Sequence, residues 1–423
     1  MRKTILWLFL IALIIRAIIA LLQVRFGIDN QLNLDYYLYG PYNDGFEIYH
    51  DFYSYYMVQL ADLGQGLLPY RDFAYAYPPL FLYTLYPFYL IAGQYAASIP
   101  ILVTDAATAP LVYLLVRRFA SDRIAFVAGL SYAVSPFFLL YEAYLWFSSQ
   151  PMTFFLLLSI YLLLIKKPEF SAIIFAIAVL FKQETFLILP VYLIWLYKDN
   201  RRAFSKGLVT ILSIIFIVSL PFLILTPAKF IASMSYEIID YVPTQPTTGI
   251  SSQSYSLACS SVSNTWRSLI CNYGSFTYTD VKSVPPLTVL FSGPFLNTIS
   301  IWIAVPLIGL AIFYLFLNQR DENSLLLASS LALMIFIVIF DFEIHSILRY
   351  YLVPVYALII SSSENRITLL LAATIPVFSL FMPSGSIEML PPLITILVLL
   401  MMRYMKYLNS SNLLQNKLAR QLP

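Results

Sequence analysis

Charged residues are scarce in this sequence. Asp, Glu, Lys and Arg make up only 11% of its 423 residues, against about 25% in soluble proteins. This shortage excludes an ordinary soluble domain, and the net charge of +3 gives no reason to expect a nucleic-acid partner. Instead, 60% of the residues are hydrophobic, and apolar runs of about 15–20 residues recur along the chain, as in membrane proteins.

Histidine and cysteine are almost absent as well. The two histidines are His50 and His345, and the two cysteines are Cys259 and Cys271, which is too small a set to indicate a zinc site. The sequence also lacks a Walker motif and a G-x-G-x-x-G segment, which excludes a nucleotide-coupled mechanism of those types. No motif implies a cofactor, and a divalent cation held by Asp or Glu stays an open alternative. In an oxidising compartment the two cysteines could form a disulfide or remain two free thiols.

The apolar runs predict an all-α fold, a polytopic membrane helical bundle of about twelve spans. Short basic clusters separate the runs, and such clusters favour the cytoplasmic side. If all of them face the cytoplasm, both termini do so too. The clusters are Arg2/Lys3, Arg117/Arg118/Arg123, Lys166/Lys167, Lys198/Arg201/Arg202/Lys206, Arg320, Arg366 and Arg403/Lys406. The predicted spans are 4–23, 97–117, 123–140, 151–165, 170–182, 184–197, 207–226, 297–317, 325–341, 350–362, 367–382 and 390–407.

This arrangement divides the chain into three parts. Residues 1–226 form a transmembrane module with a first large outer loop over 24–78, residues 227–296 form a second outer loop, and residues 297–423 form the last spans and a short cytoplasmic tail. The apolar segment 79–92 is short and contains a proline, so we expect it to be interfacial or re-entrant. A genuine membrane hairpin is the alternative.

The first outer loop gathers acids and tyrosines. Residues 24–78 hold seven acids, two bases and eleven of the 33 tyrosines, and tyrosine favours the membrane–water boundary. Residues 47–63 contain no Pro or Gly and predict an amphipathic helix on the bilayer surface. On a helix, Asp44, Glu47 and Asp51 share one face. They are either a solvated surface or an active site with a general base or a bound cation.

Charged residues within or beside the apolar runs need a reason, because charge in the membrane is costly. Arg16 and Asp105 lie in the first and second predicted spans and could form a structural pair. Lys182 and Gln183 lie at a predicted outer edge, in "FKQET". They are either a plain turn with a lysine that extends to the water, or donors for a substrate phosphate.

The segment "DFEIHSILRYYLVP", residues 341–354, is also predicted to face outward. His345 and Arg349 are four residues apart and share a helical face. They are either the polar end of a helix beside an aromatic belt or a phosphate site, because the planar guanidinium of Arg binds two phosphate oxygens at once.

Residues 51–80, "DFYSYYMVQLADLGQGLLPYRDFAYAYPPL", carry a resemblance to a known family. An acid after the first span, a helix, the motif G-x-x-P-Y and an aromatic stretch ending in Y-P-P occur here as Asp51, Gly66, Pro69-Tyr70 and 77–79. This order resembles the first outer loop of GT-C glycosyltransferases, integral membrane enzymes that use polyprenyl-phosphate sugars. It is similar to the branch with the GPI first mannosyltransferase and the bacterial phosphatidylinositol-mannoside enzymes.

The resemblance implies an inverting glycosyltransferase that moves a hexose, mannose before glucose, from a polyprenyl or dolichyl phosphate to a lipid, glycan or protein acceptor. The active site would face away from the cytoplasm, at the surface of the membrane lipid. Asp51 would be the catalytic base, and Asp44 or Glu47 could supply the second acid that many relatives place beside it. The expected site is catalytic Asp51 and Asp44, with substrate-binding Glu47, His50, Tyr77, Lys182, Gln183, His345, Arg349 and Tyr350.

Two other classes fit a polytopic membrane protein. A transporter or lipid flippase predicts internal repeats and broken spans in matching positions of two halves, and the sequence shows neither. A polymerase or ligase of lipid-linked glycans would place its key residues mainly in the second outer loop. That loop, 227–296, holds few charged residues, which favours the glycosyltransferase.

Overall fold

The computed structural model describes residues 1–26, 52, 56–73, 75, 77–199, 201–234, 306, 308–313, 322–340, 350–380 and 391–402. These residues form helices joined by short turns, with one isolated β-bridge between Pro69 and Phe73. The all-α prediction is therefore confirmed for the described part of the chain.

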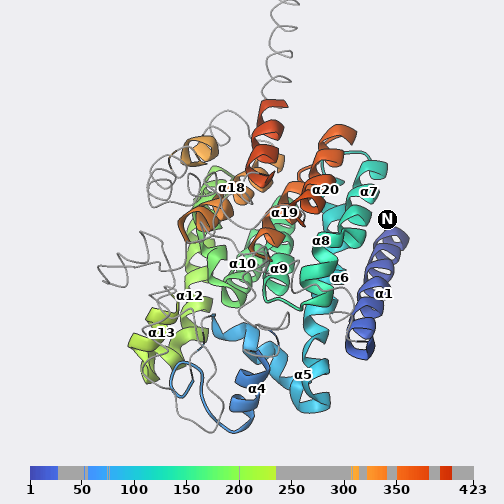
Figure 1. Cartoon of the computed structure of the whole chain (residues 1–423). Coiled ribbons are helices and arrows are strands. Elements are labelled where there is room, and N and C mark those ends of the chain that lie inside the picture. Colours follow the sequence, from blue (N-terminus) through green and yellow to red (C-terminus); the bar gives the residue numbers. More distant parts are fainter. Residues whose placement is uncertain are drawn as a thin grey trace, which may run out of the picture.

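Five helices form a row through the molecule. In Figure 1, α12 (Arg201–Leu225), α10 (Pro168–Phe181), α9 (Ser149–Leu164), α6 (Ile99–Val116) and α1 (Arg2–Phe26) follow one another, and each packs against the next. The row follows chain order, so the first helix of the chain lies at one edge. At this edge α1 packs against α6, α7 and the π-helical turn Leu139–Tyr144.

The C-terminal helices cover this row. Helix α19 (Leu352–Ser361) is buried along its whole length and packs against α9, α6, α18 (Glu322–Phe340) and α20 (Arg366–Leu380). Its closeness to α9 and α6, about 200 residues away in sequence, brings the segment around Tyr350 to the middle of the bundle. Further helical segments are α7 (Asp122–Val134), α8 (Pro136–Phe138), the π-helical turn Leu139–Tyr144, the 3-10 turn Gln183–Ile188, α11 (Leu189–Asp199) and α13 (Pro227–Met234).

Local sequence explains where several helices begin and end. The Ser121 hydroxyl accepts a hydrogen bond from the Ile124 amide and caps α7. Pro136 ends that helix, because the residue before a proline avoids the helical conformation. Proline also occupies the first turn of α6 and α10, where its missing N–H has no intrahelical partner to lose.

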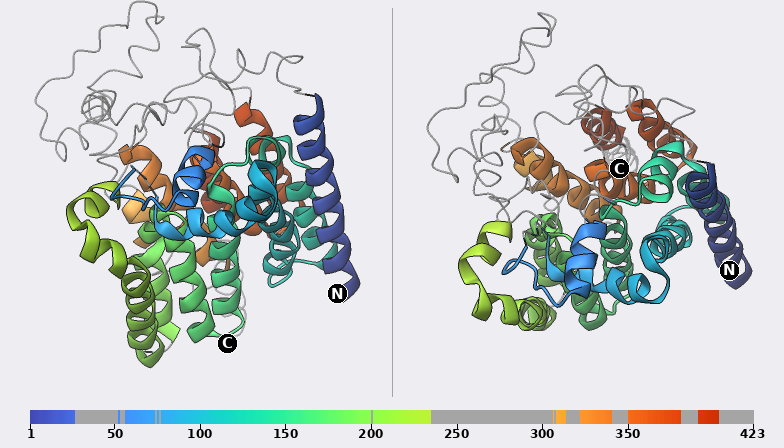
Figure 2. Two further views of the ribbon diagram at one scale, coloured as in Figure 1. Left: turned by 90° about the horizontal axis from the view of Figure 1, so that it is seen from below. Right: turned by 60° about the horizontal axis from the view of Figure 1, so that its bottom comes forward.

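Two helices that come after α1 in the chain lie together. Helix α4 (Met57–Gly64) packs against α5 (Pro79–Ala97), and α5 runs across the end of the bundle in both views of Figure 2. Gly93 breaks α5 with φ 74° and ψ −159°, a conformation open almost only to glycine. The prediction that 79–92 does not cross the membrane stays a prediction.

Four helical stretches of the described residues are long and apolar enough to cross a membrane: Arg2–Arg25, Tyr95–Val116, Asp122–Tyr144 and Arg201–Leu225. Seven shorter apolar helices accompany them. Twelve spans are not established by these helices. The span predicted at 184–197 begins with a 3-10 turn and becomes α-helical only at Leu189. The span predicted at 123–140 falls within the helical stretch Asp122–Tyr144, in which α7 ends at Val134 and further helical turns follow.

Candidate active site

A buried ion pair lies at the end of α10. Lys182 caps this helix in an extended conformation, which turns the chain sharply into the 3-10 turn. Its Nζ lies 2.6 Å from Glu184 Oε1, and the two side chains are 0% and 3% exposed. Burial of a lysine without a carboxylate partner is unfavourable. In the segment "FKQET" the partner, Glu184, lies two residues after Lys182.

Three tyrosine rings surround the Lys182 ammonium group. Its Nζ lies 3.8 Å from the ring centre of Tyr351, 4.4 Å from that of Tyr350 and 5.8 Å from that of Tyr77. Aromatic faces attract cations within about 6 Å. The hydroxyls of Tyr77 and Tyr350 are 3.4 Å apart. Three residues predicted for the site, Tyr77, Lys182 and Tyr350, therefore converge, and we call this group with Tyr351 and Glu184 the caged lysine.

The motif G-x-x-P-Y shapes the loop that delivers Tyr77. Gly66 has φ 82° directly after α4, a conformation for which glycine is preferred at a helix end. Tyr70 also has a positive φ, 66°, which is unusual for a bulky residue. Its hydroxyl donates to the Tyr77 carbonyl at 2.5 Å, and its ring packs edge-on against Phe222 and Phe230. Burial raises the pKa of the Tyr70 hydroxyl well above its ordinary value, so it remains a donor.

Aromatic contacts link Phe52 to the caged lysine. The ring of Phe52, the residue after Asp51, is buried and lies 4.7 Å from the ring of Trp146. Trp146 has a positive φ of 54°, and the next residue, Phe147, stacks on Tyr350 at 4.3 Å. The Phe52–Trp146 and Phe147–Tyr350 contacts thus join segments more than 90 residues apart in sequence.

The predicted Arg16–Asp105 pair is confirmed. Arg16 Nε lies 2.5 Å from one Asp105 oxygen and Nη2 lies 3.1 Å from the other, with both side chains fully buried. Arg16 Nη1 also donates to the Ala133 carbonyl at 2.8 Å. The Tyr132 hydroxyl donates to Asp105 at 2.8 Å, and Gln150 lies 3.1 Å from that hydroxyl. This cluster ties α1 to α6 and α7.

Several predicted site residues lie outside the described residues: Asp44, Glu47, His50, Asp51, His345 and Arg349, together with Cys259 and Cys271. Their roles and the disulfide stay predictions. Gln183 is described and partly buried next to the caged lysine. Among the described residues, no group of three His, Cys, Asp or Glu side chains could hold a metal ion.

The sequence reading missed part of the site. Glu184 was visible two residues after Lys182, and Tyr351 was visible next to Tyr350, but neither was selected. Glu142 was missed as well. It is fully buried on the π-helical turn, where Ser149 Oγ lies 3.4 Å from its Oε1. A carboxylate inside an apolar run was the signal that could have drawn attention to it.

These features define a class: a helical membrane protein with a buried, aromatic-caged cation beside the segment that contains Tyr70 and Tyr77. Residues 54–225 match the family described as dolichyl-phosphate-mannose-protein mannosyltransferase. This segment includes Tyr77 and Lys182, and its match agrees with the predicted resemblance to membrane glycosyltransferases that use polyprenyl-phosphate sugars. No curated protein matches the sequence.

Solved structures of one archaeal enzyme are similar to the chain. The oligosaccharyltransferase of Archaeoglobus fulgidus in the apo form matches with 15% identity and a TM-score of 0.43, over 91% of this chain and 56% of that one. AglB from the same organism, in complex with an inhibitory peptide and a dolichol-phosphate, matches with 17% identity and a TM-score of 0.42, over 88% and 55%. The chain spans a little over half the length of these proteins.

Proposed function

We propose that the protein transfers a hexose, foremost mannose, from a polyprenyl or dolichyl phosphate to an acceptor hydroxyl, with inversion at the anomeric carbon. The active site faces away from the cytoplasm, and the acceptor is a lipid, glycan or protein. The observation that carries the proposal is the caged lysine: a buried cation in the family-matched segment, joined by aromatic contacts to Phe52, the neighbour of Asp51.

The charge of the site limits how it can hold a phosphate. Lys182 and Glu184 together are neutral, so the pair alone offers a phosphate no net positive charge. An added cation is required, because an unpaired anion near hydrocarbon is unfavourable by several kcal/mol. Arg349 directly precedes Tyr350, whose ring lies 4.4 Å from Lys182 Nζ. This neighbourhood supports Arg349 as the second cation, with His345 as a further donor.

The reaction needs one base and fixed positive charge. Asp51 takes the proton of the acceptor hydroxyl, and that oxygen attacks the anomeric carbon from the side opposite the phosphate. The bond between the anomeric carbon and the phosphate oxygen breaks, and the lipid phosphate leaves with its electron pair. Lys182 and Arg349 stabilise the negative charge that grows on it. Tyr77 offers a flat face on which a sugar ring can lie.

The test is turnover of defined donors by the purified full chain in proteoliposomes. Polyprenyl phosphates carrying mannose or glucose are supplied, and release of the lipid phosphate is measured. Asp51→Asn keeps the shape but removes the proton acceptor, so turnover should fall about 10²–10⁴-fold. Asp44→Asn is the matched control in the same segment and should reduce turnover less than Asp51→Asn does. Full activity of Asp51→Asn with an inactive Asp44→Asn moves the base to Asp44, and no release from any donor rejects the function.

A further inference from the structure

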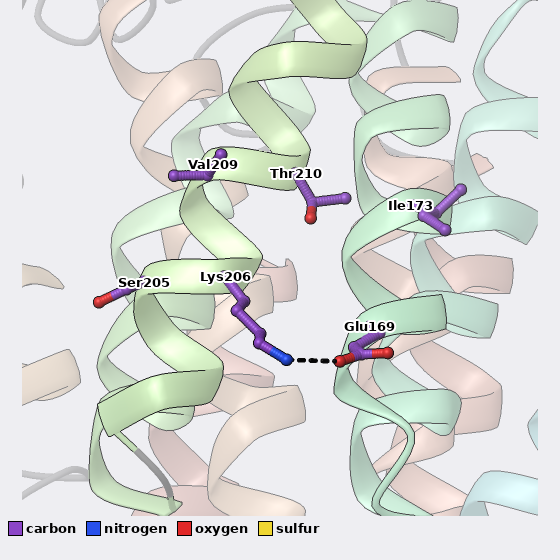
Figure 3. Close-up of a pocket in the computed structure, with 6 residues that line it drawn as sticks. All are labelled: Glu169, Ile173, Ser205, Lys206, Val209 and Thr210. Atoms are coloured by element: carbon purple, nitrogen blue, oxygen red, sulfur yellow. Dashed lines mark hydrogen bonds and ion pairs between the residues drawn. The ribbon is translucent and has the colours of Figure 1, made fainter.

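A surface hollow of about 540 Å³ lies between α10 and α12. Its lining residues are Glu169, Ile173, Ser205, Lys206, Val209 and Thr210 (Figure 3). Glu169 stands in the first turn of α10, whereas Lys182 caps the last turn of the same helix. The hollow therefore lies at the end of α10 away from the caged lysine and is no part of that site.

The hollow is polar at one end and apolar at the other. Figure 3 shows Lys206 and Glu169 pointing toward each other across the gap, with Ile173 and Val209 further along the two helices. Lys206 Nζ lies 3.2 Å from Glu169 Oε1, and the side chains are 69% and 71% exposed. Exposed pairs of this kind are worth little, so both charges are available to a ligand.

The apolar end continues along the surface of α12. Val209, Leu212 and Phe216 are all exposed, and their spacing of three and four residues places them on one helical face. Helix α12 is one of the four stretches long and apolar enough to cross a membrane. A ligand in the hollow would thus have a polar head at Lys206 and hydrocarbon along this stripe.

The polar end strongly favours an anion. The segments 166–169 and 198–206 carry six bases and two acids, a net charge of +4. The helices α10 and α12 both begin here, and helix N-termini carry partial positive charge. Basic residues at the membrane surface attract anionic lipid headgroups.

We propose that this hollow binds one anionic phospholipid of the surrounding bilayer. The phosphate lies at Lys206, with the hydroxyl of Thr210 on the same side of α12 (Figure 3), and an acyl chain follows Ile173 and the exposed stripe of α12. The proposal does not rest on glycosyl transfer, so it stands or falls separately from the proposed function.

Substitutions of Glu169 and Lys206 should change lipid affinity in opposite directions, which gives the proposal a test. A lipid phosphate competes with the Glu169 carboxylate for Lys206, so Glu169→Gln should tighten lipid binding about two- to five-fold. Lys206→Gln removes one attractive charge and should weaken binding about five-fold. Both side chains are exposed, so neither substitution should disturb folding. Arg123→Gln is the matched control, because Arg123 is an exposed base on another helix.

The experiment titrates the purified, delipidated full chain with phosphatidylglycerol and with phosphatidylcholine of the same acyl chains, and counts bound lipids by native mass spectrometry. Preferential binding of phosphatidylglycerol, weakened by Lys206→Gln, strengthened by Glu169→Gln and unchanged by Arg123→Gln, supports the site. Equal binding of both lipids, or equal effects of Lys206→Gln and Arg123→Gln, overturns it. Displacement by glycerol phosphate at the concentration of the lipid would identify a soluble anion as the ligand and also overturn it.

Discussion

Two ion pairs in the described part of the chain are deeply buried, and they are built differently. Arg16 and Asp105 share two hydrogen bonds, and further backbone and side-chain groups complete the shell around them. The contacts described around Lys182 include the carboxylate of Glu184 and three tyrosine ring faces. Both pairs escape the cost of isolated buried charge, and they differ in that aromatic ring faces lie against the second cation at 3.8 to 5.8 Å.

This difference indicates what each pair can do. A planar guanidinium with several fixed bonds holds its partner in one geometry, and Arg16 holds the edge helix α1 against α6. An ammonium group is a compact charge on a flexible stem with three rotatable donors, and ring faces attract it without fixing the direction of its N–H bonds. The first pair suits a structural role, and the second suits a site where a ligand comes and goes.

The largest expected effect tests the structural pair. Asp105→Ala leaves Arg16 buried without its carboxylate, so the free energy of unfolding should fall by about 3–5 kcal/mol. Replacing both residues, as Arg16→Met with Asp105→Leu, should destabilise less, because no charge is left uncompensated. Denaturant titration of the detergent-solubilised protein measures both. Equal losses in the single and double variants would break the comparison.

Substitution of the caged lysine should affect catalytic turnover, whereas substitution of the Arg16–Asp105 pair affects stability. Lys182→Met should lower turnover of the polyprenyl donor about 10²–10³-fold, because a charge aimed at the leaving phosphate is lost. The variant also leaves Glu184 unpaired, so Lys182→Met with Glu184→Gln separates the two effects. The double variant should regain stability but not activity, by denaturant titration and phosphate release. Recovery of turnover would make Lys182 a structural residue.

Several residues of the two buried pairs could be predicted from the sequence, because charged residues are conspicuous in segments that cross a membrane. Arg16, Asp105 and Lys182 stood out because charge is rare in apolar runs, and the motif around Gly66 and Tyr70 was recognisable by order and spacing. The convergence of Tyr77, Lys182 and Tyr350 was expected only through the resemblance.

Other features depended on packing that no local pattern reveals. The stacking of Phe147 on Tyr350 joins distant segments, and one phenylalanine among the 32 in the chain carries no distinguishing mark. The π-helical turn after Pro136 and the break at Gly93 shifted helix ends, because a single residue can redirect a helix that composition would continue. For the same reason, apolar runs did not fix the number of spans.

A smaller effect on donor binding is expected from the tyrosine rings around the caged lysine. Tyr351 offers the nearest ring to Lys182, so Tyr351→Leu should raise the KM for the donor about 2–30-fold, the range of cation–π interactions. Tyr351→Phe keeps the ring and should stay near the normal value. Donor titrations of both variants in the phosphate-release assay provide the measurement. Equal KM values for the Phe and Leu variants would mean that the ring face of Tyr351 does not contribute to donor binding. The proposed difference between the caged lysine and the Arg16–Asp105 pair would then lose its basis.

The smallest effect extends the comparison to an exposed pair. Asp72 accepts hydrogen bonds from the Arg71 guanidinium and from the Leu68 amide at 2.8 Å. These contacts, that of Arg71 first, lower the pKa of the Asp72 carboxyl below its ordinary value. The folded pKa is thus below the unfolded one. The stabilisation is present above the unfolded pKa, about 3.9, and is lost as the pH falls through the folded pKa.

Because this pair is solvent-exposed, its contribution is screened and the loop should loosen only locally. Hydrogen exchange of the Leu68 amide gives the measurement. Its protection factor should fall below about pH 4 in the wild-type protein and lose this pH dependence in Asp72→Asn, while the caged lysine and donor turnover at neutral pH stay unchanged. A wild-type profile in Asp72→Asn would assign the protection to the surrounding turn. An equally large fall in donor turnover would show that the turn before Tyr77 controls the cage, and the exposed pair would then belong with Lys182.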